Sequence, residues 1–72
     1  MITTVIRKRK VISWKRRFLI ETILEDEKII MRKSEIIFGI NVPLDETYVT
    51  DNRAAIKLET LWTFKLLGFT LN

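Results

Sequence analysis

Hydrophobic residues recur every three or four positions in the last third of the chain. The residues that share this spacing are Ala55, Leu58, Trp62, Leu66 and Phe69. Such a stripe predicts an amphipathic helix over about residues 51–67. Asp51 or Thr50 suits the N-cap, because a short side-chain oxygen accepts a free first-turn N–H. Gly68 suits the left-handed position that follows a helix.

The first fifty residues have a different pattern, with apolar side chains on alternating positions. They hold 19 of the 23 Ile, Val and Thr residues, and β-branched side chains favour strands over helices. We predict strands over about 3–14, 17–25 and 28–40, and Pro43 ends the third because proline has no N–H for a ladder. A helical stripe through 18–38 is the alternative.

The fold class that follows is α+β, in a single domain of residues 1–72. A three-stranded antiparallel sheet is followed by one C-terminal α-helix, in the order β-β-β-α. Apolar side chains occupy both faces of the predicted strands: Phe18 and Ile20 alternate with Leu19 and Ile23. One helix covers only one face of a sheet, so the apolar surplus is expected to meet a second subunit.

Composition leads to the same homodimer by another argument. The chain has 72 residues, of which 47% are hydrophobic, and it has no Cys and no His. Domains this small usually need disulfides, a metal or a partner subunit, and only the partner remains. The candidate residues for the dimer interface or the core are Ile29, Met31, Ile37, Leu58, Trp62, Leu66 and Phe69.

The order of the predicted elements, with the segment Leu61-Trp62-Thr63-Phe64 in the helix, resembles the small uncharacterised prophage proteins of the Yopt type. The resemblance covers the whole chain by layout and does not rest on a specific motif. It implies a homodimer with three strands and one helix in each subunit. It implies no known activity and carries over no functional residues.

Charge is distributed unevenly along the chain. Residues 1–20 contain seven cations and no acid, and residues 21–52 contain eight acids and three cations. A cationic strand with an aromatic residue suits a phosphate backbone and its bases. The candidate nucleic-acid-binding residues are Arg7, Lys8, Arg9, Lys10, Trp14, Lys15, Arg16 and Arg17. The alternatives are an exposed cationic edge strand, cations paired with a partner's acidic residues, and a Trp14 ring packed against protein, which we favour over stacking.

The sequence contains few of the residue types that catalysis commonly requires. Without His or Cys, the serines and threonines have no histidine base, so we predict a non-enzymatic protein with no catalytic residues, no metal site and no cofactor. The acidic run Glu25-Asp26-Glu27 is expected to be a solvated turn. The longest apolar run, residues 36–40, is far shorter than the roughly 20 residues of a membrane span. A cytoplasmic protein that does not contact a membrane is therefore expected.

Two functions from different classes remain. The first is a protein–protein interaction module, a phage-derived or accessory homodimer that binds and modulates a host protein through its surface, and the excess of apolar surface motivates it. The alternative is a small nucleic-acid-binding dimer that uses the basic segment 7–17. The sequence names neither the target nor the kind of nucleic acid.

Overall fold

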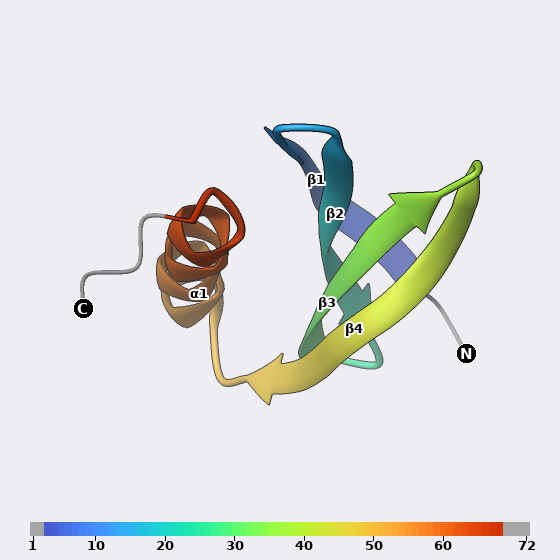
Figure 1. Ribbon diagram of the computed structural model, residues 1–72. Helices are drawn as coiled ribbons and strands as arrows, with labels where there is room; N and C mark the ends of the chain where they lie inside the picture. Colours follow the sequence, from blue (N-terminus) through green and yellow to red (C-terminus); the bar gives the residue numbers. More distant parts are fainter. Residues whose placement is uncertain (1–2, 69–72) are drawn as a thin grey trace.

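The computed structural model describes residues 3–68, which form an antiparallel sheet followed by one helix (Figure 1). The strands pair in sequence order, β1-β2-β3-β4. The elements are β1 (Thr3–Ser13), β2 (Arg16–Glu25), β3 (Lys28–Ile37), β4 (Ile40–Val49) and α1 (Asn52–Leu66). Residues 18–38 therefore belong to two strands, and the alternative of a long helix there is wrong.

The fourth strand corrects the predicted fold, because a three-stranded sheet does not describe this chain. β3 ends at Ile37, earlier than predicted, and β4 returns from Ile40. Phe38 and Gly39 form a two-residue turn with φ values of 51° and 76°. Two successive left-handed residues give the hairpin turn whose twist matches that of the strands beside it. The sheet thus has β-β-β-β-α order.

Pro43 lies within β4 and does not end the sheet. The pairing of β3 with β4 shifts beside it, from Lys33 opposite Asp45 to Ser34 opposite Pro43, so Leu44 has no partner in the register. A proline is tolerated at such a bulge on an edge strand, where no ladder hydrogen bond needs its N–H. β1 at the other edge has a similar irregularity between Val5 and Arg7.

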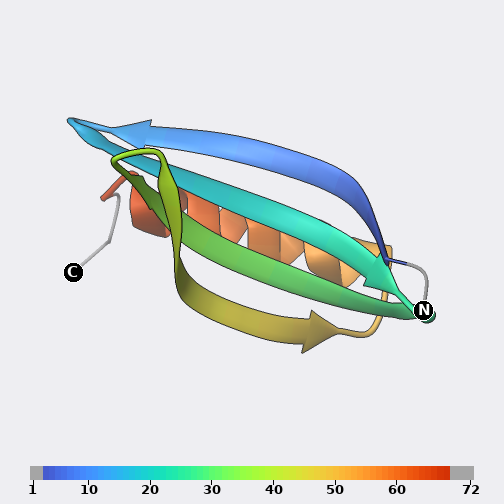
Figure 2. The ribbon, with the colours of Figure 1, turned by 90° about the vertical axis from the view of Figure 1, so that its right-hand side faces the viewer.

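The three hairpin turns that join β1 to β4 each contain two residues. Asp26 and Glu27 connect β2 to β3 with φ values of 48° and 66°, so the acidic run contains an exposed turn as predicted. The other two turns, at residues 14–15 and 38–39, lie at the opposite end of the sheet (Figure 2). Neighbouring antiparallel hairpins must alternate in this way, and the consequence is that these two turns share one end of the molecule.

Helix α1 lies along one face of the sheet (Figure 2). The buried core cluster consists of Val11, Phe18, Ile20, Met31, Ala55 and Trp62, with Ile29, Val49, Leu58, Leu66 and Leu67 packed around it. As predicted, Asp51 is the N-cap and accepts a 2.8 Å hydrogen bond from the Ala54 N–H. Gly68 follows the helix at a φ of 80°.

The residues predicted for the dimer interface or the core lie mainly inside one chain. Ile29, Met31, Leu58, Trp62 and Leu66 belong to the packing between helix and sheet. Ile37 is exposed near the Phe38 turn, and Phe69 lies outside the described residues.

Truncating Trp62 should remove most of the stability of the fold. The side chain is 4% exposed in the core, and replacing a buried tryptophan by alanine costs about 3–5 kcal/mol, which is comparable to the whole stability of a domain this small. We expect Trp62→Ala to be largely unfolded in urea titrations followed by far-UV circular dichroism. Trp14→Ala is the matched control, because that ring is 97% exposed. A wild-type urea midpoint for Trp62→Ala would contradict the described core.

Candidate functional site

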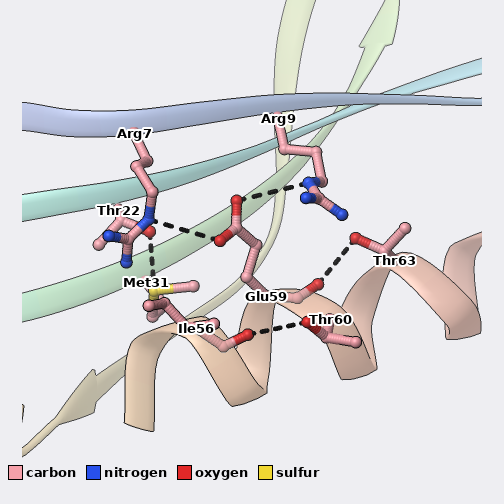
Figure 3. Close-up of polar contacts among 8 residues, drawn as sticks. All are labelled: Arg7, Arg9, Thr22, Met31, Ile56, Glu59, Thr60 and Thr63. Atoms are coloured by element: carbon pink, nitrogen blue, oxygen red, sulfur yellow. Dashed lines mark hydrogen bonds and ion pairs between the residues drawn. The ribbon is translucent and has the colours of Figure 1, made fainter. Parts of the chain in front are cut away.

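Two of the basic residues proposed to bind nucleic acid instead fasten β1 to the helix. Arg7 and Arg9 point from β1 toward Glu59 of α1 (Figure 3). Their Nε atoms lie 3.4 and 3.6 Å from the two carboxylate oxygens of Glu59. The Glu59 side chain is 9% exposed, whereas Arg7 is 30% and Arg9 50% exposed. The carboxylate is therefore largely removed from water and depends on these two cations.

Glu59 was missed by the sequence analysis, although the sequence contains a signal for it. It is the only acid in residues 53–72, and it lies four residues after Ala55 and three before Trp62, on the buried side of the helix. A lone carboxylate at a core position needs a cationic partner. Arg7 and Arg9, at odd-numbered positions of β1, are that partner.

Removing the Glu59 carboxylate should destabilise the fold. Nε and Nη2 of Arg7 are buried and have no hydrogen-bond partner among the described residues, so the nearby charge of Glu59 is their main compensation. We expect Glu59→Ala to lower the free energy of unfolding by about 2 kcal/mol, although alanine itself favours a helix. Urea denaturation measures the change.

The control is Arg9→Gln. Because Arg9 is half exposed, water replaces much of its interaction, and the expected loss is under about 1 kcal/mol. Equal losses for Glu59→Ala and Arg9→Gln would contradict the greater importance of the buried carboxylate.

A third candidate cation, Arg16, is held by Glu35 of β3. Its Nε and Nη2 atoms donate hydrogen bonds of 3.0 and 2.9 Å to the two carboxylate oxygens, and its guanidinium lies 5.0 Å from the centre of the Phe18 ring. The hydrogen bonds from Arg16 lower the pKa of Glu35; burial opposes this shift, and the positive charge of Arg16 adds to it. Arg16 is thus fixed on the helix side of the sheet.

The lowered pKa of Glu35 gives a pH prediction with a definite sign. A carboxyl group whose pKa is lower in the folded state stabilises the fold above its unfolded pKa, and this contribution disappears as the pH falls through the folded pKa. We expect an NMR titration of the Glu35 carboxyl to give a pKa below the ordinary glutamate value of about 4.3. Arg16→Gln should return it toward that value, and an unchanged pKa in this variant would contradict the assigned cause.

The other four candidate cations have no carboxylate within 4.0 Å among residues 3–68. The face of the sheet away from the helix contains three of them, Lys8, Lys10 and Arg17. Lys15 lies in the turn between β1 and β2. Because side chains alternate along a strand, the arginines on the helix side of the sheet have carboxylate partners, whereas the cations on the other face remain available to a ligand.

Two aromatic residues occupy the turns at the shared end of the hairpins. Trp14 is 97% exposed and Phe38 is 99% exposed, so the expectation that Trp14 packs against protein is wrong within this chain. Both have positive φ values, 58° and 51°, a conformation that costs a bulky L-residue about 1–2 kcal/mol. The turn at Asp26 and Glu27 has positive φ values as well, so the feature that distinguishes the turns of Trp14 and Phe38 is the exposure of a large aromatic ring.

We call this part of the molecule the hairpin end and define it by the exposed side chains around the two turns. They are Lys10, Ile12, Trp14, Lys15, Arg17, Phe38 and Ile40. Residues 10–17 contain four cations and no acid, and residues 34–42 contain one acid, Glu35. The turn at the opposite end of the sheet contains Asp26 and Glu27. Positive charge and aromatic surface are therefore concentrated together at the hairpin end.

A small hollow of about 170 Å³ lies beside the hairpin end, lined by Lys10, Val11, Ile12, Arg17, Phe18 and Ile36. Within residues 3–68, no group of three acidic residues is placed to hold a metal ion. The helix of the described part is too short and too polar to cross a bilayer. What the hairpin end offers is cations, apolar side chains and two exposed aromatic rings.

Comparisons with protein-family models, with curated proteins and with solved structures find no match to this chain. The resemblance to Yopt-type prophage proteins therefore stays a prediction. The fold and the hairpin end are the observations from which a function can be argued.

Proposed function

We propose that the hairpin end binds single-stranded nucleic acid. Trp14 and Phe38 stack on unpaired bases, while Lys10, Lys15 and Arg17 neutralise phosphates. The observation that carries the proposal is the pair of fully exposed aromatic rings on the two turns at this end of the sheet, with cations nearby that have no carboxylate partner among the described residues. Aromatic side chains combined with a positive surface are the recurring means of binding single strands.

This proposal narrows the binding segment that the sequence suggested. Arg7, Arg9 and Arg16 each have a carboxylate partner in the same chain, so they are not counted among the phosphate contacts. The turns contain two residues each and project from the end of the sheet (Figure 1). Rings presented in this way suit bases that are already unstacked, and we therefore favour a single strand over a duplex.

Binding of a host protein is the competing function, and the exposed apolar residues Ile40, Val42 and Leu44 along β4 favour it. Addition of a partner's strand to this edge is hindered, however, because Pro43 and the bulge at Leu44 interrupt it. Within residues 3–68, the two most exposed aromatic rings lie at the hairpin end, together with Lys10, Lys15 and Arg17, which have no carboxylate partner, so nucleic acid is the function that the geometry supports better. A cytoplasmic location is part of this proposal and rests on the absence of Cys.

The aromatic contribution can be tested with fluorescence anisotropy of labelled dT20 and U20 oligonucleotides. The double variant Trp14→Ala, Phe38→Ala should weaken binding at least tenfold, because stacking contributes about 1–3 kcal/mol per base. Phe64→Ala is the matched control: its ring is also exposed, but it lies on helix α1. Its affinity should stay within about twofold of wild type.

The ionic contribution to binding is measured by how the affinity for the oligonucleotide depends on salt concentration. Counterion release gives a slope of log K against log salt of about −0.7 per phosphate contact for single strands, so three cations give a slope of about −2. Arg17→Gln should reduce the steepness by about 0.7, whereas Lys57→Gln, on the exposed side of the helix, should not. No binding of either oligonucleotide at tens of micromolar protein in low salt would refute the proposal and would favour binding of a host protein instead.

A further inference from the structure

The face of the sheet away from the helix, which we call the open face, has a row of alternating charges across its middle. The register places Lys8 of β1 opposite Glu21 of β2. It then places Glu21 opposite Arg32 of β3, and Arg32 opposite Glu46 of β4. Arg32 Nε donates a 3.0 Å hydrogen bond to Glu46. Across the four strands the charges therefore run plus, minus, plus, minus.

One row beside the charged row is apolar and contains Val5, Ile23, Ile30 and Tyr48, and the other is mixed and contains Lys10, Leu19, Ser34 and Pro43. The central apolar residues of both rows, Leu19, Ile23 and Ile30, are already buried within the single chain. Val5 and Tyr48 are exposed at the two edges of their row. No other element of residues 3–68 lies on this face, which is turned toward the viewer in Figure 2.

We infer that the open face binds the open face of a second copy of this chain, with the two-fold axis parallel to the strands. Such an axis reverses the order of the strands in the facing sheet, so β1 faces the second copy's β4 and β2 faces its β3. Lys8 then faces Glu46, and Glu21 faces Arg32. Because the interface is isologous, each pair occurs twice, and every charge in the row meets its opposite.

The charged row also selects between the two simplest arrangements. A two-fold axis perpendicular to the strands, through the same row, would place each residue opposite its own copy. Lys8 would then face Lys8, and Glu21 would face Glu21. Like charges brought together at an interface repel each other, so the axis parallel to the strands is the one that this sequence favours.

A second observation on the open face supports the same occupant. The Ser34 hydroxyl is buried, with the residue 3% exposed, and it has no hydrogen-bond partner among the described residues. It lines a hollow of about 280 Å³ together with Glu21, Arg32, Asn41 and Pro43. In the inferred arrangement the second copy's Lys10 faces Pro43. Its ammonium group can therefore enter the hollow, donate to the Ser34 hydroxyl and neutralise Glu21.

The dimensions of the sheet set an upper limit on the contact area of such a dimer. Four strands about 4.8 Å apart and ten residues of about 3.3 Å each make a face of roughly 600 Å². Two such faces in contact cover at most about 1,200 Å², where stable interfaces begin, and the exposed residues of the edge strands supply most of this contact because Leu19, Ile23 and Ile30 are already buried within the single chain. Facing sheets pack about 10 Å apart with their strands about 30° from parallel. The helices lie on the two outer surfaces of this sandwich.

The inference does not require nucleic-acid binding but affects it, because a Lys10 bound to the second copy leaves Lys15 and Arg17 as the phosphate contacts of the dimer. An axis parallel to the strands keeps both hairpin ends at the same end of the dimer. Two copies of Trp14 and Phe38 would then be presented together.

Site-directed cross-linking tests the arrangement directly, because the chain has no cysteine of its own. Lys8→Cys and Glu46→Cys both alter exposed positions, and a short bis-maleimide would join them across the interface. We expect efficient cross-linking when the two variants are mixed. Little is expected when either is treated alone, since the two copies of one introduced thiol would be separated by the width of the sheet. Cross-linking of Lys8→Cys alone, or none in the mixture, would overturn the inference.

Charge reversal provides a second test by sedimentation equilibrium. Wild type should be a dimer at high micromolar concentration, whereas Glu21→Lys and Arg32→Glu should each dissociate at least tenfold more readily. An equimolar mixture should recover association, because the ammonium introduced in one variant then faces the carboxylate introduced in the other. Circular dichroism of each variant shows whether it is folded. A monomeric wild type, or no recovery on mixing folded variants, would refute the open-face dimer whether or not the protein binds oligonucleotides.

Discussion

The attraction between Glu59 and the two arginines of β1 decides how the layers of this protein hold together. Helix α1 has fifteen residues and must cover a sheet of four strands. On the helix side, β1 presents Arg7 and Arg9 before it reaches the buried Val11, so apolar packing cannot by itself attach this edge strand. The carboxylate of Glu59 replaces that packing with two ion pairs. Without the carboxylate, the buried Nε and Nη2 atoms of Arg7 would have no compensating charge.

Strand alternation gives adjacent cations different roles in this chain. Arg7 and Arg9 face the helix, whereas Lys8 and Lys10 face the opposite side. The same division separates Arg16, which is paired with Glu35, from Arg17. A run of charges that looks uniform in the sequence is therefore partly structural and partly available for partners. Its contribution to binding cannot be estimated from net charge alone.

The predictable parts of the fold are those governed by local patterns. Helix α1, its Asp51 cap and Gly68 follow from short-range rules of spacing and capping, and the first three strands follow from β-branched content. β4 does not follow from these rules, because Pro43 indicates the end of a strand and the turn residue Phe38 does not resemble the usual Asn or Gly. Glu59 and Trp14 depend on tertiary contacts: a helical spacing does not show that a distant strand supplies arginines, nor does composition show that a tryptophan lies on a turn.

The interruptions at both edges of the sheet limit how far the protein can assemble. Ile6 and Leu44 each fall outside the register, so neither β1 nor β4 offers an unbroken row of hydrogen-bonding groups to another chain. Growth by lateral addition of strands is therefore suppressed at both sides. Another copy can still bind to the face away from the helix, and a two-fold contact there covers this face in both copies. Such geometry terminates at a closed pair and disfavours fibres, which matters for a chain with many β-branched residues.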